Sequence, residues 1–262
     1  MVTLEEIVLH KKKELKEIKG ALPEAKLLQG LGKNRQIPRG FRKALRGRNG
    51  IRIIAEIKKA SPSEGVICED FNVMKIAECY ENSGVCAISV VTESKFFMGR
   101  ASYLAMVRSE TELPVLRKDF LIDRYQIVES AVLGCDSALL IAGILNDKQL
   151  DEFISELENY EIDPLVEVHT EEEVDRALHA GAKLVGINNR DLKTMRVDIK
   201  TSEVLVKRIP KNVTKIAESG FESYDEIKRL VDMGIDAFLV GTSILKSKNM
   251  EHKIKELRGV GV

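Results

Sequence analysis

Apolar and polar positions alternate along most of this chain in a regular rhythm. After residue 50, short apolar runs rich in β-branched residues recur at 51–58, 86–91, 114–118, 136–141, 164–168, 184–187, 213–217 and 237–240. Between these runs, apolar residues recur at helical spacing, as in Val174, Ala177 and Leu178. The pattern predicts eight strands alternating with helices, and connections this short indicate a parallel sheet.

Two arrangements of such a sheet were considered, an open doubly wound sheet and a closed barrel. No GxGxxG motif follows the first strand, which counts against the open sheet. A length of 262 residues is normal for one α/β barrel. We therefore predict an α/β fold, a single (β/α)8 TIM barrel spanning 49–262.

The first 48 residues follow a different pattern. Thr3 to Glu6 resembles a capping box, and a helical apolar stripe follows it. A second short helix is expected over 41–45, after Pro38 and Gly40. We interpret 1–48 as a helical extension that packs on the barrel within one domain. The lysine run at 11–13 is expected to form a solvated face.

Composition excludes several classes of protein. Lys+Arg and Asp+Glu both number 41, so the formal net charge is zero and does not favour a nucleic acid as partner. Trp is absent, so the chain also lacks the aromatic side chains on which bases commonly stack. No apolar run approaches the roughly 20 residues of a membrane span, and the N-terminus lacks a signal-peptide pattern. The four cysteines lack CxxC spacing and the four histidines are scattered. We expect a cytoplasmic protein with reduced thiols, no metal site and no membrane contact.

Charged residues stand where the predicted strands end. In the first strand, Glu56 and Lys58 share one face because side chains alternate with a period of two. Other strand ends carry Thr92-Glu93, Arg117-Lys118-Asp119, Glu167, Asn188-Asn189-Arg190-Asp191 and Glu218. Any one of these could be a structural ion pair. In a barrel, however, all would point into one mouth, which predicts an acid–base site there.

Two strand ends carry a further signal. Ser219 and Gly220 follow the seventh strand, and Gly241, Thr242 and Ser243 follow the eighth. Backbone amides at helix starts bind phosphate oxygens, and these two loops are the usual phosphate site of such barrels. Ordinary helix capping is the alternative for either loop alone. Together they predict a phosphorylated substrate.

At this point the motifs resemble the indole-3-glycerol phosphate synthase family over nearly the whole chain. The resemblance rests on IAEIKKASPS (54–63), VTESKFF (91–97), LRKDFLID (116–123), LVEVH (165–169), GINNRDL (186–192) and AESG (217–220). Met98, Arg100 and Arg124 depart from the family pattern, and they affect the expected shape of loops rather than the acid–base set.

The resemblance implies a carboxy-lyase of tryptophan biosynthesis. Its substrate would be 1-(2-carboxyphenylamino)-1-deoxyribulose 5-phosphate, which would undergo ring closure, decarboxylation and dehydration to indole-3-glycerol phosphate. By resemblance, Lys118 would be the general acid of ring closure, and Glu167 and Lys58 the base and acid of dehydration. Glu56 and Asn188 would orient these groups, and Glu218 would anchor the substrate.

The resemblance also implies the residues that bind substrate. Ser61, with the loops around Ser219, Gly220, Gly241, Thr242 and Ser243, would hold the phosphate. Pro62 and Phe97 would form apolar contacts with the aromatic ring of the substrate. For Phe97, the alternative is that it only packs against other residues of the protein. Arg190 would pair either with the substrate carboxylate or with a glutamate of the site. No cofactor is implied, and a monomer is expected, with other tryptophan-pathway enzymes as possible partners.

Two other functions were weighed. A phosphoribosylanthranilate isomerase would need a Cys/Asp pair at strand ends, and neither Cys68 nor Cys86 is well placed for that role. A catalytically silent barrel acting as an assembly subunit would have no use for Lys58, Lys118 and Glu167.

Overall fold

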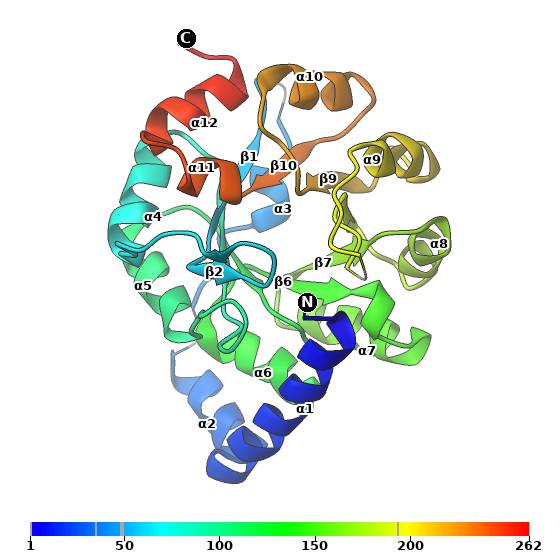
Figure 1. Ribbon diagram of the computed structural model, residues 1–262. Coiled ribbons are helices and arrows are strands. Elements are labelled where there is room, and N and C mark those ends of the chain that lie inside the picture. The colour runs from blue at the N-terminus through cyan, green and yellow to red at the C-terminus, as the bar shows by residue number, and fades with distance from the viewer. Residues whose placement is uncertain (1, 35, 48–49, 193, 262) are drawn as a thin grey trace.

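Parallel strands form the centre of the molecule (Figure 1). The computed structural model describes residues 2–34, 36–47, 50–192 and 194–261. Within these ranges eight strands close into a barrel in chain order, and the last pairs with the first. They are β1 (Ile53–Ile57), β4 (Ala87–Val91), β5 (Val115–Lys118), β6 (Ser137–Ile141), β7 (Asp163–Val168), β8 (Leu184–Asn188), β9 (Thr214–Glu218) and β10 (Ala237–Val240). The predicted (β/α)8 barrel is confirmed.

Helices surround this barrel (Figure 1). They are α4 (Val73–Asn82), α5 (Ser102–Glu110), α6 (Arg124–Leu133), α7 (Asp147–Asn159), α8 (Glu171–His179), α9 (Lys200–Leu205), α10 (Tyr224–Asp232) and α12 (Met250–Arg258). Short helical turns lie at η1 (Ala142–Ile144), η2 (Val206–Arg208) and α11 (Thr242–Leu245). In the part of the chain that the structure describes, every helix is too short or too polar to cross a membrane.

The barrel interior is apolar at one end and charged at the other. Inward side chains such as Ile54, Leu116 and Leu165 pack together with Phe41 and Leu45. The two latter residues come from α3 (Phe41–Ala44) and its end, at the far side of the barrel in Figure 1. In the part of the chain that the structure describes, these apolar side chains fill the bottom of the barrel, and the cavity opens at the carboxyl ends of the strands.

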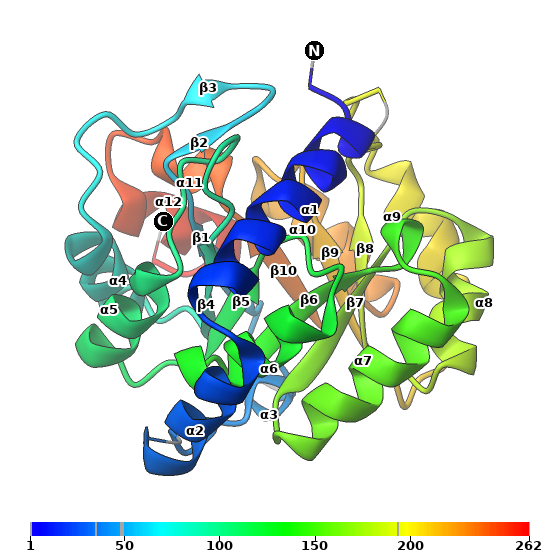
Figure 2. The ribbon, with the colours of Figure 1, turned by 90° about the horizontal axis from the view of Figure 1, so that it is seen from below.

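Two further helices precede the barrel. α1 (Leu4–Ala21) begins with the predicted capping box between Thr3 and Glu6. α2 (Glu24–Asn34) packs against α6. Figures 1 and 2 show α1 running from the rim beside α2 toward the barrel mouth. The expected boundary between 48 and 49 lies outside the described residues.

The lysine run on α1 is not uniformly solvated, so that expectation was wrong. Lys12 and Lys13 are exposed, but Lys11 is only 4% exposed. Its Nζ lies 3.0 Å from Asp119 Oδ1 and 2.7 Å from Glu14 Oε2. Lys11 shares the buried stripe of Ile7 and Leu15, since residues four apart lie on one helical face. Helical phase, rather than local charge, decides its environment.

The segment after the first strand contains a small hairpin. β2 (Ala60–Ser61) pairs antiparallel with β3 (Gly65–Val66). Ser61 turns the chain by accepting the Glu64 N–H through both its carbonyl and its hydroxyl, each at 3.3 Å. Gly65 takes a φ of +65°, which glycine adopts without steric cost.

We predict that Lys11→Met lowers the free energy of unfolding by about 2 to 4 kcal/mol, because it leaves the buried Asp119 carboxylate with less compensating charge. Urea unfolding checks the change. Lys13→Met is the matched control, because this lysine is exposed on the same helix. Equal losses from the two substitutions would contradict a specific role for the buried ion pair.

Candidate active site

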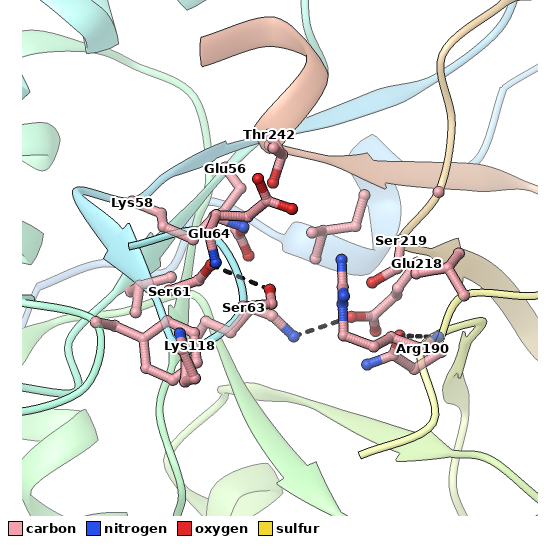
Figure 3. A pocket seen from close by; sticks show the side chains of 18 of the residues that line it. Glu56, Lys58, Ser61, Ser63, Glu64, Lys118, Arg190, Glu218, Ser219 and Thr242 are labelled. Atoms are coloured by element: carbon pink, nitrogen blue, oxygen red, sulfur yellow. Dashed lines mark hydrogen bonds and ion pairs between the residues drawn. The ribbon is translucent and has the colours of Figure 1, made fainter. Parts of the chain in front are cut away.

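A cavity of about 780 Å³ opens at the carboxyl ends of the strands. Figure 3 shows Glu56 and Lys58 on one side of it and Glu218, Ser219 and Arg190 on the other. The fifteen residues that the resemblance assigns to catalysis or substrate binding all line this cavity: Glu56, Lys58, Ser61, Pro62, Phe97, Lys118, Glu167, Asn188, Arg190, Glu218, Ser219, Gly220, Gly241, Thr242 and Ser243. The alternation of side chains along parallel strands therefore brings them to one place.

Lys118 lies at the centre of the charged groups. Its Nζ donates to Glu167 Oε2 at 3.0 Å and to Glu218 Oε2 at 2.9 Å. Burial alone would lower the pKa of Lys118, but the carboxylates of Glu167, Glu218 and Glu56 outweigh burial and raise it above its usual range. The ammonium is therefore protonated near neutral pH and aimed into the cavity.

The side chain of Glu218 has a pKa close to neutral pH, so both of its protonation states are accessible there. Burial and the nearby Glu167 charge raise the pKa of Glu218 to about 7, although Lys118 opposes the shift. Its Oε1 is buried without a hydrogen-bond partner among the described residues. A Cβ on Gly186 would lie 2.2 Å from that oxygen. Glycine on β8 thus provides the space that the Glu218 carboxyl occupies.

The first strand contributes an ion pair of its own. Lys58 Nζ lies 2.7 Å from Glu56 Oε1. Burial would raise the pKa of Glu56, but Lys58 and Lys118 lower it. A Cβ on Gly241 would come within 2.7 Å of the same oxygen, so this glycine also makes room for a carboxylate.

Glu167 is held by groups from three strands. Burial would raise its pKa, but Lys118, His169 and a hydrogen bond from Asn188 lower it. Asn188 Oδ1 accepts the Arg190 N–H at 2.9 Å, which orients the amide. The Arg190 guanidinium donates to the Met195 carbonyl, a partner not expected from the sequence.

Four strand-end residues are not among the residues that line the cavity, contrary to expectation: Thr92, Arg117, Asn189 and Asp191. The contacts of Arg117 and Asn189 show where these two side chains lie instead. Arg117 lies behind β5, where it donates to Ser130 and Glu129 of α6. Asn189 accepts from Ser202 of α9 and donates to the Ser219 carbonyl. Both follow from alternation, because neighbours of inward-facing Lys118 and Asn188 must face outward.

The Phe97 segment is shaped by a buried carboxylate. Glu93 accepts the backbone N–H groups of Lys95, Phe96 and Phe97 at 2.7 to 3.1 Å. Met98 has a φ of +54°, a conformation uncommon for residues other than glycine. The departure from the family pattern at this residue therefore coincides with an unusual backbone.

The two glycine-containing loops lie side by side. Ser243 Oγ donates to the Phe221 carbonyl at 2.8 Å and links them. Ser219 and Gly220 have φ values of +69° and +91°. A Cβ on Gly220 would lie 2.4 Å from Val197. The turn therefore depends on glycine for both backbone conformation and space.

Some residues of the site were missed from the sequence. His169 lies behind Glu167, two residues along β7, and alternation would have placed it on the same face. Val2, Leu4 and Ile7 line the cavity from the N-terminal segment, a contact without a local sequence signal. Cys68 and Cys86 are not among the lining residues that the structure describes. The described residues also hold no group of three or more His, Cys, Asp or Glu placed to bind a metal ion.

A barrel whose mouth holds two lysines among three buried carboxylates defines a (β/α)8 enzyme built for general acid–base catalysis. A family model described as indole-3-glycerol phosphate synthase matches residues 4–257. The chain belongs to this family.

Relatives bearing that name match almost end to end. The chain is 45% identical to one from Thermoanaerobacter pseudethanolicus, over 99% of this chain and 100% of the relative. It is 46% identical to one from Caldanaerobacter subterraneus subsp. tengcongensis, over 98% and 99% of the two chains. Among solved structures, thiamine phosphate pyrophosphorylase from Pyrococcus furiosus aligns with a TM-score of 0.60 at 14% identity, over 80% of this chain and 94% of that one. This last likeness shows the fold alone.

We predict that Glu218→Gln changes how stability depends on pH. The Glu218 pKa of about 7 exceeds the unfolded value, about 4.3, so the stability it contributes is complete below pH 4 and is lost as pH rises through 7. Glutamine cannot ionise, so the variant does not share this loss of stability. The unfolding free energy of the variant minus that of the unsubstituted protein should therefore rise by about 2 to 3 kcal/mol from about pH 5 to about pH 8.

Urea unfolding at a series of pH values measures this difference. Glu172→Gln, at an exposed position of α8, is the control. Stability curves for Glu218→Gln that run parallel to those of the unsubstituted protein would contradict a raised pKa at Glu218.

Proposed function

We propose that the chain is a carboxy-lyase of tryptophan biosynthesis that makes indole-3-glycerol phosphate from 1-(2-carboxyphenylamino)-1-deoxyribulose 5-phosphate. The reaction closes a ring and releases CO2 and water. The observation that carries the proposal is the position of Lys118, between Glu167 and Glu218 at the mouth of a barrel of this family.

Ring closure requires an activated ketone, because the aromatic carbon that carries the carboxylate is a weak nucleophile. Lys118 donates a proton to the ketone oxygen as that carbon attacks, which leaves a hydroxyl on the new ring. Its raised pKa supports this role, since the ammonium is present at neutral pH. Loss of CO2 then returns the bonding electrons to the ring and restores its aromaticity.

Dehydration needs a second acid and a base. Lys58 protonates the departing hydroxyl, and Glu167 removes a ring proton as the indole double bond forms. The lowered pKa of Glu167 keeps the carboxylate ionised near neutral pH, which is the state that accepts a proton. Glu56 holds Lys58 at 2.7 Å, while Asn188 orients Glu167. Glu218 anchors the substrate and keeps Lys118 charged.

The ends of the substrate are bound by different walls of the cavity. Ser61, with the loops of Ser219–Gly220 and Gly241–Ser243, holds the phosphate. Pro62 and Phe97 pack on the aromatic ring, and Arg190 pairs with the substrate carboxylate. The phosphate assignment is supported by the left-handed turn at Gly220 and by its place in the cavity wall, because such glycine turns bind anions through backbone amides.

We also propose that residues 1–48 form an extension of one domain that completes the cavity, since Val2, Leu4 and Ile7 line it. The chain acts as a cytoplasmic monomer without a cofactor. Its ligand is a small phosphorylated molecule, and other enzymes of the same pathway are the candidate protein partners.

The direct test is an assay of indole fluorescence after mixing the purified chain with synthetic substrate. We expect turnover without added cofactor. A folded protein that gives no product would overturn the proposed activity.

We predict that Lys118→Ala abolishes turnover but changes the affinity for a phosphate-containing substrate analogue by less than about tenfold, because the lysine acts on the ketone and not on the phosphate. The fluorescence assay and calorimetry measure the two effects. Lys207→Ala, at an exposed position of η2, is the control and should behave like the unsubstituted chain. A comparable loss of analogue binding would instead assign Lys118 to the phosphate.

Gly220→Ala is predicted to raise KM by about tenfold or more with a smaller effect on kcat, because its Cβ displaces the loop from Val197. Gly234→Ala is the matched control, since Gly234 has a φ of +102° but open space around its Cβ position. It should cost about 1 kcal/mol of stability or more and leave KM unchanged. Equal KM effects from the two variants would rule out a site-specific cause.

A further inference from the structure

Glu167 lies between Lys118 and His169, and of these two residues only Lys118 has a role in the proposed reaction. Its Oε2 accepts from Lys118, and its Oε1 lies 3.5 Å from Nε2 of His169. Glu167 and His169 are two residues apart at the end of β7, so their side chains leave the strand on the same side. The imidazole therefore lies directly behind the carboxylate that we assign as the base.

A second carboxylate holds the other side of the imidazole. Glu173 Oε2, on α8, accepts the His169 backbone N–H at 2.6 Å and lies 3.4 Å from Nδ1 of the ring. The Glu173 side chain is itself confined, because a Cβ on Gly143 of η1 would lie 3.0 Å from its Oε1. Contacts among η1, β7 and α8 thus fix one line of groups that runs from Glu173 through His169 to Glu167.

The His169 ring has a buried nitrogen atom with no hydrogen-bond partner among the described residues. This atom is Nε2, and the side chain as a whole is 15% exposed. A buried, unpaired ring nitrogen costs free energy unless it is used. The atom that it faces is Glu167 Oε1, and a small approach would complete a hydrogen bond.

We propose that His169 is a positioning residue for the reaction: backed by Glu173, it donates from Nε2 to Glu167 and holds that carboxylate ionised and correctly oriented. This inference rests on the proposed role of Glu167 as the base. It extends the site by one layer, from the cavity wall to α8.

The charges around His169 support this assignment. Burial would lower the pKa of His169, but Glu173, Glu167 and the more distant Glu218 outweigh it and raise the pKa above its ordinary value. In return, His169 helps Lys118 to lower the pKa of Glu167. The two effects are reciprocal, because each group stabilises the charged form of the other.

The first test uses NMR titration of imidazole signals in the full chain, which does not depend on turnover. The chain has four histidines, so single substitutions assign every signal. We expect His169 to titrate above the ordinary value of about 6.5 and Glu167→Gln to lower its midpoint by about half a pH unit or more. A midpoint at or below the ordinary value, or one unmoved by Glu167→Gln, would overturn the proposal.

The second test is the pH profile of kcat/KM for His169→Asn. Loss of the imidazolium raises the pKa of Glu167, so the acidic limb of the profile should move to higher pH by about half to one unit. We expect kcat to fall by about tenfold while KM changes by less than about threefold. A purely structural role would lower activity equally at every pH, and that outcome would also overturn the proposal.

Two further variants complete the design. Glu173→Gln should shift the acidic limb in the same direction by a smaller amount, and it keeps the proposal testable if His169→Asn does not fold. His179→Asn, at an exposed position of the same helix α8, should leave the profile unchanged. An inactive unsubstituted chain would overturn the proposed function, whereas the NMR titration would still decide the coupling between His169 and Glu167.

Discussion

The structure of the site depends on compensating the charge of one partly buried ammonium group. Lys118 lies at the mouth of the barrel and is kept charged by carboxylates on β1, β7 and β9. Unpaired burial of any member would cost several kcal/mol, so the groups stabilise the site only as a set. Burial raises the pKa of Glu218, and the neighbouring carboxylates of Glu167 and Glu56 raise it further, while Lys118 opposes the shift. The same cluster of charged groups therefore sets the pKa values of the site and lowers the free energy of unfolding when one member is left unpaired.

Space for this cluster is created by residues that carry no charge. Gly186 and Gly241 lie where a Cβ would meet Glu218 and Glu56. Below them, the barrel is packed with apolar side chains, among them Phe41 and Leu116. The apolar layer beneath the charged groups lowers the local dielectric constant, and this strengthens the electrostatic interactions at the mouth.

Much of this architecture could be predicted from sequence because it follows from periodicity. Alternation along each strand places Glu56, Lys118 and Glu167 inward, and chain order closes the barrel. The same rule, applied residue by residue, would have turned Arg117 outward and placed His169 beside Glu167. The pairing of Lys11 with Asp119 has no such local signal, because it joins a helix and a strand end 108 positions apart. Only the packed fold determines that contact.

The two lysines of the cavity differ in a way that bears on their chemistry. Lys118 is shared by two carboxylates, each within 3.0 Å, and is fixed between them. Among the described residues Lys58 has one ion-pair partner, Glu56, and it lies just before the hairpin. A fixed acid suits ring closure, where the ketone must meet a proton in one geometry. A singly tethered ammonium has more freedom to follow a hydroxyl as it leaves. This difference in restraint favours Lys118 for the first step and Lys58 for the second.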